Sequence, residues 1–353
     1  MSSGNRARGL HDDKAIDNAA LTALREAHGE QVSGLPPVAI VIAAYNEEGG
    51  IGPVIAALPN AVCGLPTATV VVADGCADGT VQEARDHGAI VCDVPVNRGQ
   101  GAALRLGYRI AREGGAQYIV TTDADGQYNP AEIDTLMGPL LAGEADFVTG
   151  SRRLGSEETK DPVRRLGVRV FALTISALTG QRISDTTFGL RAMRSEVTGA
   201  VRLDQPQYQA AELLIGVMSR GFRVVERPAT IHKRKVGESK KGHNAIYGLH
   251  FANVIARTWW RERVLGGRRS AQVAAGLAST VQEKTGQPSP GQPASRPSAD
   301  QPADGDRGPA AAAGLSSPES STVAARRSAD DTGAVVVPAP APSAEEPRSA
   351  KRT

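Results

Sequence analysis

Two carboxylates stand two residues apart, directly after a short apolar segment that is rich in β-prone residues. Asp123 and Asp125 follow residues 116–120, a pattern that predicts a buried strand ending at the acidic pair. Open α/β sheets bind ligands at that edge, and close carboxylates repel each other unless a cation lies beside them. Mg²⁺ and Mn²⁺ prefer oxygen ligands and bridge to substrate phosphates. We therefore expect Asp123 and Asp125 to hold such a cation against a diphosphate, with the amide oxygen of Gln127 as a further ligand. A solvated acidic turn is the alternative.

Several arginines could bind a second phosphate. Arg152 lies where the next predicted strand ends, on the same sheet edge as the acidic pair, and arginine suits a phosphate there. An ordinary surface arginine is the alternative. Arg164, Arg165 and Arg169 cluster near the start of a helix predicted at 160–179. This cluster is compatible with an anionic head group, although most such helices only separate a core face from a solvated face.

Three later features have both a structural and a functional interpretation. The segment 231–242 is densely basic and contains glycines, so it could be a flap over phosphates or a solvated charge run. It lacks interleaved aromatic residues, and the net charge is only +2, so we predict no nucleic-acid partner. Trp259 and Trp260 among arginines suit a membrane interface, packing on the domain or a dimer contact. Glu212 lies among apolar residues and is either a paired structural group or a site carboxylate.

The pattern of elements favours an α/β fold. Predicted strands alternate with predicted helices, which indicates a mostly parallel central sheet, helices on both faces and a Rossmann-like nucleotide-binding half. The loop at Gly99 and Gly101 lacks the third glycine of a dinucleotide fingerprint, so a dehydrogenase is rejected. A tight turn that points the next helix N-terminus at an anion, or an ordinary strand-to-helix connection, is preferred. Strands are expected at 38–44, 69–73, 89–94 and 116–120, and helices at 51–58, 80–87, 102–113 and 131–141.

Composition divides the chain into three regions. Residues 1–35 form an N-terminal extension with a possible helix, and residues 36–265 form the α/β domain. Residues 266–353 are rich in Pro, Ala and Ser, and we predict a disordered tail because few large apolar side chains are available to offset the ordering entropy. Three cysteines without metal-type spacing, no signal peptide and no membrane-length apolar run predict a cytoplasmic protein. Peripheral contact with the inner face of the membrane is compatible with this prediction.

The ordered motifs between about residues 37 and 264 resemble a family-2 glycosyltransferase of the GT-A fold, in the dolichol- or polyprenyl-phosphate mannosyltransferase-like branch. Ala43, Ala73, Gln100 and Phe188 stand where this family often has Pro, Asp, Lys and Ser. The motifs that carry the resemblance are Tyr45-Asn46-Glu47, Asp74-Gly75, Asp123-Ala124-Asp125-Gly126-Gln127, Gly150-Ser151-Arg152, residues 185–191, and Gly237-Glu238-Ser239-Lys240 with Arg234 before it.

The resemblance implies an inverting, Mg²⁺- or Mn²⁺-dependent enzyme that moves a hexose, mannose or glucose, from an NDP-sugar such as GDP-mannose to a polyprenyl phosphate. A phosphate monoester is already ionised near neutral pH, so this acceptor needs no strong general base. Asp125, Arg152 and Arg234 are the implied catalytic residues. The implied nucleotide-sugar contacts are Ala44, Tyr45, Glu47, Asp74, Gln100, Asp123 and Ala124, and the implied acceptor contacts are Arg152, Arg164, Arg234, Ser239 and Lys240.

Two other functions fit the same motifs. The same fold could transfer a sugar to a soluble hydroxyl acceptor, which would need a carboxylate base, and Glu212 is the candidate. A non-catalytic nucleotide-sugar sensor or scaffold could use the C-terminal tail for partners. The intact acidic motif disfavours the scaffold, because binding alone could tolerate the loss of metal ligands.

Overall fold

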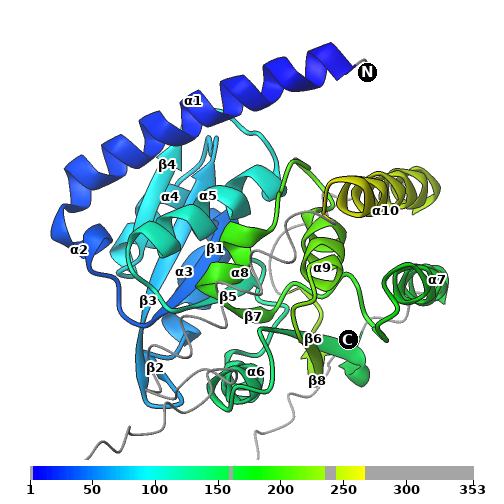
Figure 1. The fold of residues 1–353 in the computed structure, drawn as a ribbon. Helices are drawn as coiled ribbons and strands as arrows, with labels where there is room; N and C mark the ends of the chain where they lie inside the picture. Colours follow the sequence, from blue (N-terminus) through cyan, green and yellow to red (C-terminus); the bar gives the residue numbers. More distant parts are fainter. Residues whose placement is uncertain (1–2, 159–161, 235–243, 267–353) are drawn as a thin grey trace, which may run out of the picture. The chain divides into compact units, whose positions relative to one another are not determined.

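The computed structural model describes residues 3–158, 162–234 and 244–266, all of which belong to one folded unit, and the elements are labelled in Figure 1. The strands are β1 (Val38–Ala44), β2 (Ala61–Val62), β3 (Leu65–Asp74), β4 (Ile90–Val94), β5 (Tyr118–Asp123), β6 (Phe147–Glu157), β7 (Arg191–Arg194) and β8 (Val224–Ile231). The helices are α1 (Ser3–His28), α2 (Glu30–Ser33), α3 (Glu48–Ala57), α4 (Thr80–Asp86), α5 (Gln100–Glu113), the 3₁₀ helix η1 (Pro130–Glu132), α6 (Ile133–Leu141), α7 (Pro162–Thr179), α8 (Ser195–Ala200), α9 (Gln209–Ser219) and α10 (Asn244–Gly266).

One mixed sheet organises the fold. Its strand order is β2-β3-β1-β5-β7-β6-β8, and β4 also pairs with β3. Strands β4, β3, β1 and β5 are parallel neighbours, whereas β7 is antiparallel to both β5 and β6. The successive crossovers run to opposite sides of β1, and open α/β sheets bind ligands where the strand order reverses in this way. The predicted α/β fold with a nucleotide-binding half is confirmed, and the second half of the sheet is the mixed part.

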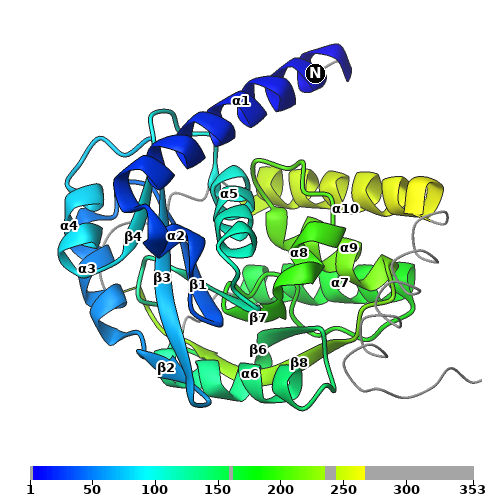
Figure 2. The same ribbon diagram turned by 60° about the vertical axis from the view of Figure 1, so that its left-hand side comes forward.

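Helices cover both faces of β1. Ala39 and Val41 pack in a cluster with residues of α1 and α5, whereas Val38 and Ile40 pack with residues of α6. Ile42 lies on the same face of β1 as Val38 and Ile40, and it packs with residues of α3 and α4. Successive side chains of a strand alternate between faces, so a strand that is covered on both sides must be apolar throughout, as β1 is. Figures 1 and 2 show α1 running beside β4 and α5.

The sheet ends at β8, which pairs in parallel with β6 across a register shift between Ser151 and Ser156. β8 is last in the strand order and contains Pro228, whose missing N–H costs least on an edge strand. The sequence of residues 224–228, with a proline that has no N–H to donate, predicts an edge strand there, and the structure confirms it. Its extension to Ile231 is longer than the sequence pattern indicated.

The tryptophan pair of α10 divides between interior and surface. Trp259 is half-buried, and its indole N–H donates to the carbonyl oxygen of Leu178 in α7 at 2.9 Å. Packing on the domain is thus the correct interpretation for Trp259, whereas Trp260 is 66% exposed. Among the helices that the structure describes, none has the combination of length and hydropathy that a membrane span requires.

Candidate active site

Four polar loops follow the parallel strands at one edge of the sheet. Tyr45 comes after β1, Gly75 after β3 and Arg98 after β4, while Asp123 is the last residue of β5. Because these strands are parallel neighbours, their carboxyl ends meet at one edge. The topology thus brings together motifs that are up to about eighty residues apart in the sequence.

Both carboxylates of the acidic motif are held by neighbouring side chains or amides. Asp123 Oδ1 accepts a hydrogen bond from Gln100 Nε2 at 3.1 Å. Asp125 is 7% exposed, and its Oδ1 accepts from the backbone N–H of Gln127 at 3.1 Å. Its other oxygen lies 2.8 Å from Arg234 Nη2. These contacts orient the two carboxylates before any ligand binds.

The side chains at this turn fit a hard divalent cation. Gln127 Nε2 donates to the carbonyl oxygen of His232 at 3.0 Å, which turns the amide oxygen to the opposite side of its group. Asp123, Asp125 and Gln127 therefore offer side-chain oxygens of the kind that a hard divalent cation binds. No group of three or more His, Cys, Asp or Glu side chains suited to a metal occurs among the described residues. Two carboxylates with substrate phosphates as further ligands match Mg²⁺ or Mn²⁺ better than a closed structural zinc site.

The loop after β1 is locked onto the loop after β3. Asn46 adopts a left-handed backbone conformation with φ 51°, and its Oδ1 accepts from the N–H of Ala77 at 2.8 Å. The N–H of Glu47 donates to Thr80 Oγ1 at 2.8 Å. Tyr45 is 39% exposed at this position and can meet a ligand. The two predicted contact residues Ala44 and Ala124 are buried, so they can offer only main-chain groups.

Asp74 is buried against the loop between β4 and α5. It is 2% exposed, and its Oδ2 accepts the backbone N–H groups of Arg98 and Gly99 at 2.7 Å each. Its Oδ1 accepts from Arg98 Nε at 3.4 Å. Burial raises the pKa of Asp74, whereas these hydrogen bonds lower it. The carboxylate therefore holds the loop between β4 and α5, and its contact with the nucleoside stays a prediction.

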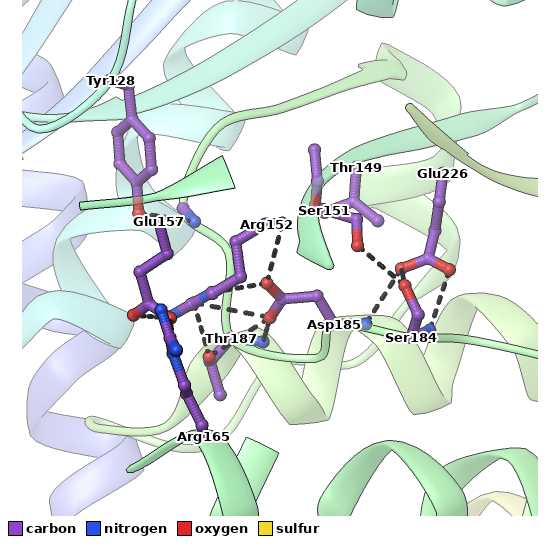
Figure 3. A network of polar contacts seen from close by, with 12 residues as sticks. Tyr128, Thr149, Ser151, Arg152, Glu157, Arg165, Ser184, Asp185, Thr187 and Glu226 are labelled. Atoms are coloured by element: carbon purple, nitrogen blue, oxygen red, sulfur yellow. Dashed lines mark hydrogen bonds and ion pairs between the residues drawn. The ribbon is translucent and has the colours of Figure 1, made fainter. Parts of the chain in front are cut away.

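Arg152 belongs to the buried polar network in Figure 3. It is 6% exposed, and its Nε donates to Asp185 Oδ2 at 2.6 Å while its Nη2 donates to Thr187 at 3.0 Å. Its Nη1 lies 3.5 Å from Glu157 Oε1, and neither of these two buried atoms has a hydrogen-bond partner among the described residues. The guanidinium therefore anchors the loop around Asp185 with one edge and lies against the Glu157 carboxylate with the other.

An aromatic pair connects Arg152 to the acidic turn. The rings of Tyr128 and Phe188 lie 4.9 Å apart, and the Arg152 guanidinium lies 5.7 Å from the Phe188 ring centroid. The Tyr128 oxygen accepts the N–H of Gly189 at 2.8 Å. A Cβ on Gly189 would come within 2.8 Å of Asp123 Oδ2, so a larger residue here would displace that side chain. Burial, with the nearby charge of Asp123, raises the pKa of Tyr128 well above its ordinary value.

A cavity of about 300 Å³ opens beside this network, between β6 and α7. Four arginines and one glutamate carry its charge, so the lining is strongly positive. Among the described residues, Glu157 pairs with Arg165 at 3.1 Å, whereas no carboxylate pairs with Arg153 or Arg169. The polar lining of the cavity consists of Arg152, Arg153, Ser156, Glu157, Arg165 and Arg169.

Part of the predicted acceptor set does not line this cavity or lies outside the described residues. Arg234 pairs with Asp125, on the acidic side of the site. Arg164 begins α7, but its side chain is not among those described. Ser239 and Lys240 lie outside the described residues.

Glu212 is a structural carboxylate. It is fully buried in α9, with Oε1 at 2.8 Å from Arg261 Nη1 and Oε2 accepting the N–H groups of Asp204 and Gln205 at 2.9 Å each. Burial raises its pKa, and these partners lower it. The hypothesis that Glu212 is a general base is corrected, since its oxygens are occupied and inaccessible to an acceptor. Arg261, which the sequence placed beside the tryptophans, serves this internal pair.

The sequence pattern missed several residues that shape the site. Asp185 and Glu226 hold the loop beside Arg152 in place. Asp185 accepts from Arg152, and Glu226 accepts the backbone N–H of Ser184 at 2.8 Å and that of Asp185. Asp17 in α1 reaches the loop after β4 through Arg98. No local signal identifies such partners, because their roles depend on contacts between segments that are far apart in the sequence.

The comparisons with known proteins agree with this geometry. The model of the family "Glycosyl transferase family 2" matches residues 39–202. The chain is 34% identical to a dolichyl-phosphate hexose transferase of Haloferax volcanii over 58% of this chain and 86% of that protein. It is 30% identical to an undecaprenyl-phosphate mannosyltransferase of Micrococcus luteus over 63% of this chain and 96% of that protein.

A solved structure gives the same fold at lower identity. It is the glucosyl-3-phosphoglycerate synthase of Mycobacterium tuberculosis in complex with Mn²⁺, UDP-glucose and phosphoglyceric acid. It matches with a TM-score of 0.52 and 19% identity, over 67% of this chain and 83% of that chain. With the motifs at one sheet edge and relatives matched over most of their length, the chain belongs to glycosyl transferase family 2.

Proposed function

We propose that this glycosyltransferase moves a hexose, mannose or glucose, from an NDP-sugar to a polyprenyl phosphate, with inversion and with a divalent cation. The observation that carries the proposal is the position of the arginine-lined cavity next to the acidic turn. The Tyr128 and Phe188 rings lie between the two, and Arg152, which lines the cavity, lies over the Phe188 ring. The names of the two relatives reported above support the lipid phosphate as acceptor.

On the donor side, the chain orients the NDP-sugar diphosphate. Asp123, Asp125 and Gln127 would hold Mg²⁺ or Mn²⁺, which when bound neutralises charge on the diphosphate leaving group. Gln100 fixes the rotamer of Asp123 through its hydrogen bond. Tyr45 and Glu47 lie in the loop after β1 and would meet the nucleoside.

On the acceptor side, the chain neutralises and aligns a phosphate. An ionised phosphate monoester is its own nucleophile, so it requires positioning more than proton removal. The exposed donors of the cavity arginines suit its oxygens. The burial of Glu212 supports a phosphate acceptor. A soluble hydroxyl acceptor would require a carboxylate base, and the buried Glu212 side chain cannot contact such an acceptor.

The amphipathic helix α7 supports contact with a membrane surface. Leu166, Val170 and Leu173 are 61%, 50% and 72% exposed, and they share a helix with the cavity residues Arg165 and Arg169. A polyprenyl chain is embedded in lipid, so a protein that binds its phosphate must approach the head groups. The proposed location is the cytoplasmic face of the membrane, as a peripheral protein. Leu173→Gln should weaken sedimentation with anionic vesicles, whereas the exposed-site control Ala177→Gln should not.

The test is a donor panel. Purified protein with Mn²⁺ is given GDP-mannose, UDP-glucose or UDP-GlcNAc, with a short polyprenyl phosphate, the corresponding polyprenol or no acceptor, and released nucleoside diphosphate is measured. The proposal expects release from one donor that depends on the lipid phosphate and is lost with EDTA. Equal release with the polyprenol, or none with any acceptor, contradicts it.

The second candidate is transfer to a small phosphorylated acceptor, and the structural relative that holds phosphoglyceric acid favours it. The arginine-lined cavity would suit a soluble phosphate as well as a lipid phosphate. Adding 3-phosphoglycerate to the same panel separates the two. Release that depends on 3-phosphoglycerate but not on the lipid would replace the first proposal.

A further inference from the structure

The N-terminal helix α1 reaches the donor side of the site through one buried ion cluster. Asp17 of α1 lies 2.6 Å from Arg98 Nη1, and Arg98 Nε lies 3.4 Å from Asp74 Oδ1. The side chains of these three residues are only 7%, 5% and 3% exposed. A buried arginine between two carboxylates has few alternative positions, because any movement leaves a charge without a partner in a low-dielectric interior.

Arg98 lies in the loop between β4 and α5, which leads to the contact between Gln100 and the acidic motif. Its own N–H and that of Gly99 are bound to Asp74, and Gly99 has a φ of +96°. The next residue, Gln100, begins α5 and donates to Asp123 Oδ1 at 3.1 Å. The position of the Arg98 guanidinium is therefore connected through two residues of backbone to an aspartate of the proposed cation site.

The loop also has little room to adjust. The N–H of Gly101 donates to the carbonyl oxygen of Pro206 at 2.8 Å. A Cβ on Gly101 would lie 2.1 Å from the carbonyl oxygen of Gln205, so the backbone is in direct contact with its neighbour. A shift of Arg98 must then change the loop conformation itself, since the loop cannot move as a rigid unit.

Most other polar contacts of α1 are more exposed. Asp13 lies 3.2 Å from Arg105, with both side chains more than a fifth exposed, and Arg25 lies 2.7 Å from Glu113, with side chains 50% and 35% exposed. Exposed pairs of this kind contribute little to stability, because solvent and salt screen them. Asp17 supplies the carboxylate of α1 that pairs with Arg98, and the backbone carbonyl oxygen of Asp13 also accepts from Arg98 Nη1 at 3.4 Å.

We propose that Asp17 is a positioning residue of the donor site. Its carboxylate holds Arg98 against Asp74, and this sets the loop of residues 97–101 and the hydrogen bond from Gln100 to Asp123. Without Asp17, the buried guanidinium keeps only Asp74 as a carboxylate partner, and its Nη2 already has no hydrogen-bond partner among the described residues. The side chain then moves toward solvent and pulls the loop with it. The inference rests on the proposed NDP-sugar function and extends it to the N-terminal helix.

The experiment compares Asp17→Asn with Asp13→Asn, a matched change one helical turn away on the same helix. Binding of fluorescent mant-GDP and mant-UDP with Mn²⁺ is titrated, and hydrogen exchange of residues 96–101 is followed. For Asp17→Asn we expect about tenfold weaker binding of the nucleotide that the wild-type protein prefers, as is common when a supporting partner of a site is lost. Faster exchange in the loop should accompany it, while Asp13→Asn stays close to the wild-type values.

Steady-state kinetics separate positioning from a general loss of structure. The KM for the donor should rise about tenfold in Asp17→Asn while the KM for the lipid phosphate stays unchanged, and Asp17→Glu, which keeps the charge, should recover part of the loss. If Asp17→Asn does not fold, Arg98→Lys is measured in the same way and should show the same rise in donor KM.

The outcomes distinguish this inference from the proposed function. A wild-type protein that binds neither nucleotide overturns the donor site and with it this role for Asp17. Wild-type binding that is equally strong in Asp17→Asn, or an equal loss in Asp13→Asn, overturns the positioning role alone.

Discussion

At the scale of single residues, the carboxylates of the acidic motif are already engaged by neighbouring groups. Asp125 is nearly buried and faces Arg234, so its charge is already balanced in the structure described here. An incoming cation would compete with Arg234 for this carboxylate. The geometry thus links the acidic turn to the basic residue on its other side, which suits a site where a diphosphate and a second phosphate must meet.

Asp125→Asn should abolish cation-dependent transfer. The amide has the shape of the carboxylate but not its charge, so the turn should persist while kcat falls by a factor of about a hundred or more. Lipid-dependent release of nucleoside diphosphate measures the effect. Asp86→Asn, on the exposed side of α4, is the control and should keep full activity. Normal kcat in Asp125→Asn would remove this residue from the proposed cation site.

Glu212→Gln should affect folding and not turnover. The substitution weakens the contact with Arg261 and turns one of the two accepting oxygens into a donor, and a loss of about 2 kcal/mol in the free energy of unfolding is expected. Urea denaturation measures the loss, and Glu26→Gln on exposed α1 should show none. Turnover per folded molecule should stay near normal, whereas a large fall in kcat at full folding would restore Glu212 as a catalytic base.

At the scale of elements, one carboxylate connects the start of β6, the start of β8 and the end of β7. Asp146, just before β6, accepts the backbone N–H of Arg223 at 2.9 Å and its Nη2 at 2.7 Å. It also lies 3.7 Å from Arg194 at the end of β7. Burial raises the pKa of Asp146, but the hydrogen bonds from Arg223 outweigh it and bring the pKa below its ordinary 3.8.

This lowered pKa makes a prediction about acid stability. The ionised form is favoured in the folded state, so the contribution of Asp146 is present above pH 4 and is lost as the pH falls through the lowered pKa. Asp146→Asn should therefore lower the free energy of unfolding by about 1.5 kcal/mol at neutral pH and by much less in strong acid. Urea unfolding at several pH values checks this. Glu144→Gln, an exposed neighbour, should leave the curve unchanged.

At the scale of the whole molecule, the proposed site residues that have described contacts lie in one folded unit. They fall between Ala44 and Arg234, and α1 and α10 support them from outside this range. Residues 267–353 carry few large apolar side chains and none of the motifs that carry the family resemblance.

A chain that ends after Gly266 should keep its activity. Its kcat with a soluble short-chain acceptor should stay within about twofold of the full chain, because a segment of this composition contributes no packed core. The melting temperature should be unchanged as well. A truncated protein that folds but has lost lipid-dependent transfer would show that the C-terminal segment takes part in acceptor binding.

The sequence by itself determined the elements and the acidic motif. Strand β1 and the end of β5 follow from apolar runs, because burial on both faces requires such residues whatever the rest of the chain does. Asp123, Asp125 and Gln127 could be singled out because their spacing is local, and their place on the sheet edge follows from the parallel order of the strands.

Only the tertiary structure decided what the other charged residues do. Asp74 and Glu212 look like site carboxylates in the sequence, yet each is buried against an arginine or amides from distant segments. The sequence pattern cannot distinguish a carboxylate that meets a ligand from one that holds a loop, because the two differ only in which long-range partner occupies their oxygens. The same reason hides Asp17, whose partner Arg98 is 81 residues away.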